Sequence, residues 1–94
     1  MPRELRETSQ FKADKRRVQR SGRHDWEKMR DVVRDQMHDR PLPERNRDHA
    51  LTGDYVGTRE CHVAPDWLLI YLKTGDADTG SMTLVRTGSH SELF

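Results

Sequence analysis

The sequence has one cysteine, Cys61, and no long apolar run. A single cysteine excludes a disulfide within the chain and suits a reducing compartment. The longest apolar run, residues 67–72, is far shorter than the roughly 20 residues that a membrane-spanning helix needs. The charged start, Met1–Glu7, lacks the apolar segment of a secretory signal. We therefore expect a cytoplasmic protein that makes no contact with a membrane.

Recognised catalytic and metal-binding motifs are also missing. The chain has no glycine-rich phosphate loop and no nucleophile elbow. Two histidines and a carboxylate could ligate iron or zinc, but there is no H-x-x-x-H pair, no second cysteine and no recognised ligand spacing. We expect neither a metal nor a cofactor.

Hydrophobic residues are scarce, at 32% of the chain against 35% charged residues. The 94 residues make a single domain, 1–94, near the lower size at which one core is sufficient, so help from a partner chain is expected. Residues 1–48 hold 14 Lys/Arg against 10 Asp/Glu, whereas residues 49–94 hold 3 against 6. The basic face therefore belongs to the first half. A charge run such as residues 12–17 is typical of a solvated helix face, and only secondarily of a phosphate-binding surface.

The first half predicts a short edge strand around Leu5 and then two helices. Thr8 or Ser9 can cap the first helix, and Gly22 can end it in the left-handed conformation. Asp25 can cap the second helix, which Pro41–Pro43 stops. The pair reads as an antiparallel helical hairpin. Its apolar positions are Phe11, Val18, Trp26, Met29, Val32, Val33 and Met37, and His24 and His38 are expected at the surface.

The second half predicts a mainly antiparallel sheet. A polar loop, residues 44–53, carries His49 and precedes a strand over residues 55–63. A Pro65-Asp66 turn leads into the central strand, residues 67–73, and after a loop over residues 74–80 the last strand covers residues 82–87. Ser89 and Glu92 fit a capping box, which predicts one final helical turn. We therefore expect an α+β domain in which the helical hairpin packs on a twisted sheet of about four strands.

Three of the five histidines, His49, His62 and His90, lie in this half together with Asp66. Imidazoles and a carboxylate can move protons near neutral pH, and Arg86 or Arg59 could hold an anion. These are the groups needed for metal-free cleavage of RNA by its own 2′-hydroxyl. The same residues also have structural interpretations. His62 can be a structural histidine, Trp67 a core residue, and Arg86 the ion-pair partner of Asp66 or Glu60.

Three long motifs decide between these interpretations. They read Asp48-His49-x-Leu51-x-Gly53, then Gly57-x-Arg59-Glu60-Cys61-His62-Val63-x-Pro65-Asp66-Trp67-Leu68-Leu69-Ile70-Tyr71, then Arg86-Thr87-Gly88-Ser89-His90-Ser91-Glu92-Leu93-Phe94. The chain thus resembles the YafQ branch of the RelE/ParE-type toxins, which are ribosome-dependent mRNA interferases of type II toxin–antitoxin pairs. One departure is Ala50, where the branch often has proline.

The resemblance implies a RelE-like fold and an endoribonuclease that inhibits translation, with cognate antitoxin, ribosome and mRNA as partners in a hetero-oligomer with the antitoxin. By the resemblance His90 is the general acid, Asp66 or His49 the general base, and His62 an orienting group. Arg86 steadies the phosphate, and Trp67 and Phe94 pack around or position the mRNA. Arg59, a candidate from its charge alone, is expected to bind the substrate as well. The alternatives are a non-catalytic toxin of the same fold, like those that poison gyrase, and an inactive module that binds the ribosome or the antitoxin.

Overall fold

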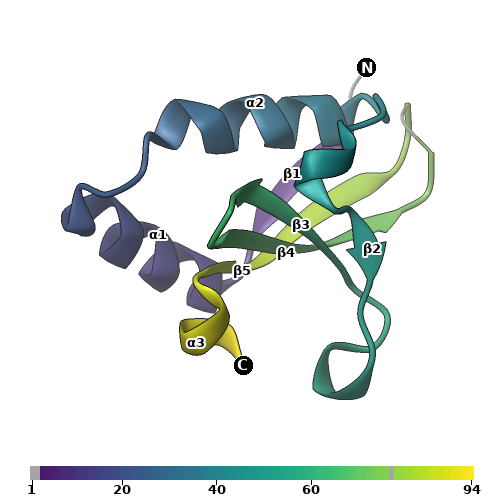
Figure 1. The fold of residues 1–94 in the computed structure, drawn as a ribbon. Coiled ribbons are helices and arrows are strands. Elements are labelled where there is room, and N and C mark those ends of the chain that lie inside the picture. Colours follow the sequence, from purple (N-terminus) through teal and green to yellow (C-terminus); the bar gives the residue numbers. More distant parts are fainter. Residues whose placement is uncertain (1–2, 77) are drawn as a thin grey trace.

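A computed structural model of the chain describes residues 3–76 and 78–94; Met1 and Pro2 of the charged start, and Ala77 of the predicted loop, lie outside the described residues. Figure 1 shows the two long helices, α1 and α2, on one face of a sheet whose strands run in the order β1-β5-β4-β3-β2. Strand β1 is parallel to β5 and the other neighbours are antiparallel. The elements are β1 (Glu4–Glu7), α1 (Ser9–Ser21), α2 (Trp26–Met37), β2 (His49–Ala50), β3 (Arg59–Ala64), β4 (Trp67–Thr74), β5 (Ser81–Gly88) and α3 (His90–Leu93).

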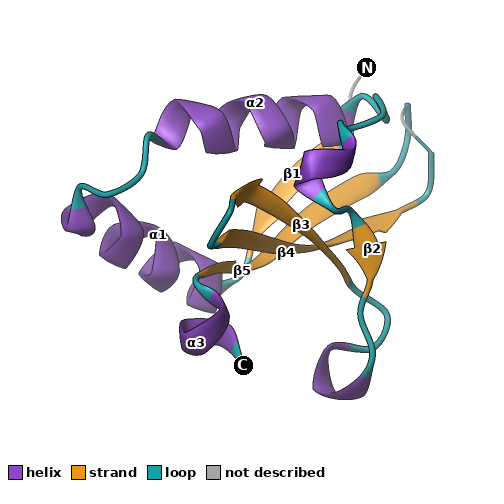
Figure 2. Cartoon of the chain, viewed as in Figure 1, coloured by secondary structure: helices purple, strands orange, loops and turns teal. Residues whose placement is uncertain are grey.

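The helix ends follow the local signals in the sequence. The Thr8 hydroxyl accepts a hydrogen bond from the Phe11 amide at 3.0 Å and caps α1, while Gly22 ends that helix with φ of 67°. The Asp25 carboxylate accepts from the amide of Glu27 at 3.0 Å and caps α2. These predicted caps are confirmed. The two helices run in roughly opposite directions and diverge from the loop that joins them (Figure 2).

Strand β4 lies at the centre of the sheet, as its continuous apolar sequence predicts. Alternate residues of β4 point to opposite faces of the sheet, and residues 67–71 are buried on both faces. The core between sheet and helices contains Phe11, Val18, Met29, Val32, Val33, Cys61, Val63, Trp67, Leu69, Tyr71, Met82 and Leu84. Burial raises the pKa of the Cys61 thiol to about 12, so this cysteine is a neutral core residue.

The other face of the sheet carries a smaller cluster of Leu68, Ile70 and Leu93, with Tyr55 packed against it. Leu93 brings α3 onto this face, and the rest of the face stays open. Strand β3 alternates in step with its partner: Cys61 pairs with Leu69 of the core, whereas His62 pairs with Leu68 of the smaller cluster. Every second residue of β3 therefore points to the open face.

The predicted boundaries before β3 are wrong in two places. The loop over residues 44–53 contains the two-residue strand β2, which makes the sheet five-stranded. Strand β3 begins at Arg59 and not at Tyr55, because Gly53–Tyr55 form a 3₁₀ turn and Gly57 has φ of 92°. None of the described helices has both the length and the apolar character that crossing a membrane requires.

Candidate active site

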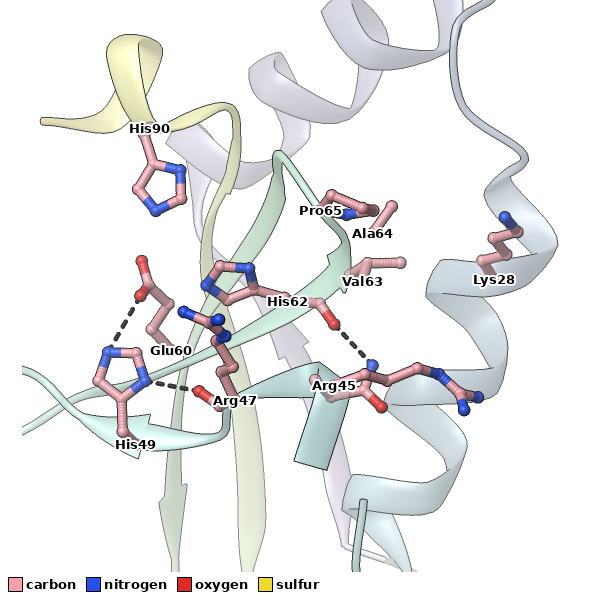
Figure 3. A pocket seen from close by; sticks show the side chains of 11 residues that line it. Lys28, Arg45, Arg47, His49, Glu60, His62, Val63, Ala64, Pro65 and His90 are labelled. Carbon is pink, nitrogen blue, oxygen red and sulfur yellow. Dashed lines mark hydrogen bonds and ion pairs between the residues drawn. The ribbon is translucent and has the colours of Figure 1, made fainter. Parts of the chain in front are cut away.

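An open groove of about 900 Å³ brings the three histidines of the second half together (Figure 3). His49 comes from β2, His62 from the open face of β3, and His90 from the start of α3. The three histidines named as candidates in the sequence analysis thus line one groove. The other lining residues are Lys28, Arg45, Asn46, Arg47, Glu60, Val63, Ala64 and Pro65.

Asp66, in the turn between β3 and β4, holds the position of His90. Its Oδ1 accepts hydrogen bonds from the ring nitrogen Nδ1 of His90 at 3.0 Å and from the His90 amide at 3.1 Å. These bonds lower the pKa of Asp66 below its usual value, the ring nitrogen contributing most. Since the resulting carboxylate can only accept, Nδ1 carries the hydrogen and Nε2 is left for a substrate. Figure 3 shows the latter nitrogen pointing into the groove.

The ring of His49 contacts the carboxylate of Glu60, its cross-strand partner. Its Nδ1 lies 2.5 Å from the carbonyl oxygen of Arg47, so Nδ1 must donate. Its Nε2 lies 3.1 Å from Oε2 of Glu60. Glu60 is only 4% exposed, and its Oε1 has no hydrogen-bond partner within the described residues.

His62 lies between the other two histidines along the groove. Its ring meets that of His90 edge to face, with centroids 5.4 Å apart. Its backbone carbonyl accepts a hydrogen bond from the side chain of Asn46 at 2.6 Å, which ties the turn before β2 to β3. The ring is half-buried and reaches both the groove and His90.

Arg86 is not among the residues that line the groove and pairs with Asp14 of α1. The Asp14 carboxylate accepts from Nε of Arg86 at 2.7 Å and from Nη2 at 3.1 Å. Arg17 links the same carboxylate to α3: its Nη1 lies 2.7 Å from Oδ1 of Asp14, and its Nε lies 2.8 Å from Oε2 of Glu92. Burial alone would raise the pKa of Asp14, but bonds from Arg86, Arg17 and the Thr87 amide outweigh it and lower the value. The predicted pairing of Arg86 with Asp66 or Glu60 is wrong, because α1 supplies a buried carboxylate.

Arg59 lies on the helix face of β3, opposite the groove. Its Nε donates to Asp48 at 3.2 Å, and the same carboxylate accepts from the Tyr71 hydroxyl and from Gln36 of α2. Asp48 directly precedes His49 in the sequence. This network therefore fixes the backbone that carries His49 into the groove. The structure therefore assigns Arg59 to that network and gives it no contact with the histidines.

Of the two aromatic residues predicted to lie near the RNA, Trp67 is buried and Phe94 is exposed. Trp67 is 0% exposed, its Nε1 donates to the Thr87 hydroxyl at 2.9 Å, and His24 stacks on its ring with centroids 4.5 Å apart. The prediction that the Trp67 side chain touches RNA directly is therefore wrong. Of the two histidines expected at the surface, His38 is exposed, whereas His24 is half-buried. Phe94 is 62% exposed and meets Tyr55 edge to face at 5.7 Å.

Four groove residues were missed as site residues at the sequence level: Lys28, Arg45, Arg47 and Glu60. Lys28 lies in a helix and the two arginines in a loop, and a positive charge alone does not indicate which part of the molecule such a side chain faces. Glu60 could have been found, because it lies two residues before His62 in a strand and hence on the same face. Within the described residues, no three His, Cys, Asp or Glu side chains gather closely enough to hold a metal ion.

Comparison with known proteins gives consistent results. Residues 3–94 match the family described as the bacterial toxin of type II toxin–antitoxin systems, YafQ. The mRNA interferase toxin YafQ of Escherichia coli K12 is 44% identical over 54 residues, which cover 57% of this chain and 54% of that protein. The match thus spans about half the length of this curated relative.

Two solved structures extend the similarity over the whole chain. The E. coli DinJ–YafQ toxin–antitoxin complex contains a chain that superposes with a TM-score of 0.84 at 33% identity, covering 100% of this chain and 99% of that one. A copper-bound mutant toxin from Helicobacter pylori superposes with a TM-score of 0.85 at 35% identity and covers 100% of both chains. The family and the α+β, RelE-like fold implied by the sequence motifs are confirmed.

Proposed function

Because this chain belongs to the YafQ family of bacterial type II toxin–antitoxin toxins, we propose that it is an mRNA interferase, an endoribonuclease that cuts messenger RNA on the ribosome and stops translation. The groove that joins His49, His62 and His90 carries this proposal. Imidazoles supply both the base and the acid that RNA cleavage needs near neutral pH. A toxin that works only by binding needs no such cluster.

The reaction that fits this groove uses the 2′-hydroxyl of the RNA as nucleophile. The hydroxyl oxygen attacks the adjacent phosphorus, the bond from phosphorus to the 5′-oxygen breaks, and a 2′,3′-cyclic phosphate forms. His90 Nε2 gives its proton to the departing 5′-oxygen. Asp66 orients His90 through Nδ1, which makes Asp66 the less suitable base.

The proton of the 2′-hydroxyl moves to Nε2 of His49, and the Glu60 carboxylate, 3.1 Å away, stabilises the imidazolium that forms. His62, whose ring touches that of His90, orients the acid and shares charge with it. Arg86 acts as a positioning residue. Two of its guanidinium nitrogens bind Asp14, which holds the end of β5, and therefore the start of α3 with His90, against α1. The mechanism requires no metal, and the copper in the H. pylori structure belongs to that protein.

A basic side of α1 supports the ribosome as the place of action. Lys12, Arg16 and Arg20 are exposed at four-residue spacing and form no ion pair within the described residues. Such a surface binds nucleic-acid phosphates irrespective of sequence. The E. coli complex with DinJ supports a cognate antitoxin as the neutralising partner in a hetero-oligomer.

The test is cleavage of a defined mRNA on translating ribosomes. We expect cuts that leave 2′,3′-cyclic or 3′-phosphate ends and that persist when ribosome integrity is maintained and chelator is added. A message with a single 2′-deoxy or 2′-methoxy nucleotide at the cut position lacks the nucleophile and should stay intact. Cleavage of that message at the same bond contradicts the mechanism. Ribosome or antitoxin binding without cleavage contradicts the proposed activity.

Deleting Phe94 should leave the melting temperature nearly unchanged and impair cleavage. The ring is mostly exposed and contacts Tyr55 by an edge, so little buried surface is lost. Thermal unfolding and single-turnover cleavage measured side by side check this, with Val56→Ala, another exposed apolar residue, as control. A large fall in melting temperature would show that Phe94 supports the fold.

A further inference from the structure

Three cations line the groove without a carboxylate partner in the part of the chain that the structure describes: Lys28, Arg45 and Arg47. By contrast, Arg17 and Arg86 are held in ion pairs by Asp14. The one carboxylate that lines the groove, Glu60, is bound to His49. The groove therefore has an excess of positive charge that no described side chain neutralises.

The turn that carries two of these cations is fixed to the site. Between them lies Asn46, 7% exposed, whose side chain donates to the carbonyl of His62 at 2.6 Å. Arg47 has φ of 45°, a left-handed conformation that arginine rarely adopts. In this conformation its carbonyl accepts the bond from Nδ1 of His49. The bond from the Asn46 side chain and the bond to the Arg47 carbonyl thus fix the turn from which Arg45 and Arg47 extend.

The two arginines serve different parts of the groove. Figure 3 shows the guanidinium of Arg47 pointing toward His62, on the side of the groove that holds His49 and Glu60. Arg45 and Lys28 lie on the side of Val63 and Ala64, away from His49. A guanidinium matches phosphate oxygens with paired hydrogen bonds and keeps its charge at every physiological pH.

We propose that Arg47 binds the phosphate at the cut position and that Arg45 and Lys28 bind neighbouring phosphates of the same RNA strand. This rests on the proposed function for the identity of the ligand, a single-stranded RNA backbone. It assigns direct phosphate contact to the turn before β2 instead of to Arg86, whose guanidinium is occupied by Asp14.

The test is binding of a short single-stranded RNA with 2′-methoxy at every sugar, which cannot be cut. Arg47→Asn removes the charge with a residue that tolerates the left-handed conformation, so the backbone is kept. Arg47→Lys keeps a positive charge at that position, and Arg45→Gln removes the charge of the second arginine. The control is Arg34→Gln, at an exposed position of α2 outside the groove. Affinity is measured for each variant across a series of salt concentrations.

We expect Arg47→Asn to weaken binding roughly 10- to 100-fold, the range for a lost hydrogen bond to a charged group. The slope of log affinity against log salt should fall by about 0.7 for each lost contact to single-stranded RNA. Arg45→Gln should show a smaller loss, Arg47→Lys a partial recovery, and Arg34→Gln no change. Unchanged affinity and slope in both Arg47→Asn and Arg45→Gln overturn the inference, as does absence of RNA binding by the unsubstituted protein.

Cleavage distinguishes this inference from the proposed function. If the unsubstituted protein cuts ribosome-bound mRNA and Arg47→Asn cuts it equally well at every protein concentration, the inference fails and the function stands. If the unsubstituted protein binds the uncut RNA through Arg47 but cuts no message on the ribosome, the function fails and the phosphate site stands.

Discussion

Replacing His90 with alanine is expected to slow single-turnover cleavage of ribosome-bound mRNA by about 10²–10⁴-fold, the usual contribution of a positioned acid. His90 is exposed, and among the described residues its ring makes a hydrogen bond to Asp66 and an edge contact with His62, so the protein should stay folded. Among the described groove residues, His49 is no equivalent donor in the same place, because its Nε2 faces the carboxylate of Glu60.

Two further variants make this result specific. His38→Ala removes an exposed histidine that does not line the groove and should cleave normally. Asp66→Asn frees the ring of His90 without removing it, so it should lose less activity than His90→Ala. The pH–rate profile of His90→Ala should also lack the limb that reports the acid. Cleavage by His90→Ala within a few-fold of the unsubstituted rate would exclude His90 as the proton donor.

Trp67→Ala should lower the free energy of unfolding by about 3–5 kcal/mol, the range for truncating a buried large aromatic residue. The indole is fully buried between the helices and the sheet, stacks on His24, and donates to Thr87. For a domain of this size each kcal/mol corresponds to roughly 4–8 °C in melting temperature. A thermal or denaturant melt should therefore show a loss well above 10 °C, or an unfolded protein.

Trp67→Phe serves as the graded control, since it keeps an aromatic ring and loses only the indole nitrogen and some volume. Its loss should be clearly smaller than that of Trp67→Ala. If Trp67→Ala instead melts like the unsubstituted protein while RNA binding disappears, the side chain contacts RNA in a conformation other than the one described.

Much of the fold could be predicted because its signals are local. Thr8, Asp25 and Gly22 determine helix ends through hydrogen bonds and backbone preferences within a few residues. Strand β4 is recognisable from its continuous apolar run, and the Ser89–Glu92 capping box predicted the turn that carries His90. The short strand β2 was missed because two residues show no alternation.

The site residues that were placed wrongly depend on partners distant in sequence. Arg86 pairs with Asp14, 72 residues away, and no local pattern links them. Whether Trp67 faces the helices or the solvent is decided by packing against α1 and α2, which its position at a strand start does not reveal. The turn that carries Arg45 and Arg47 is fixed by the bond from Asn46 to His62 and by the bond from His49 to the Arg47 carbonyl.

The alternation along β3 has a consequence for insertions, deletions and mutant libraries. Glu60 and His62 point to the groove, whereas Cys61 belongs to the core. Deleting one residue from this strand shifts the pairing by one position and exchanges the two sets, which turns a carboxylate toward the apolar core and the thiol toward the groove. Such deletions should be absent from any selected library. Combined substitutions at Glu60 and His62 should instead yield folded proteins with altered chemistry, so these two positions are the ones to randomise in a search for new activities on this scaffold.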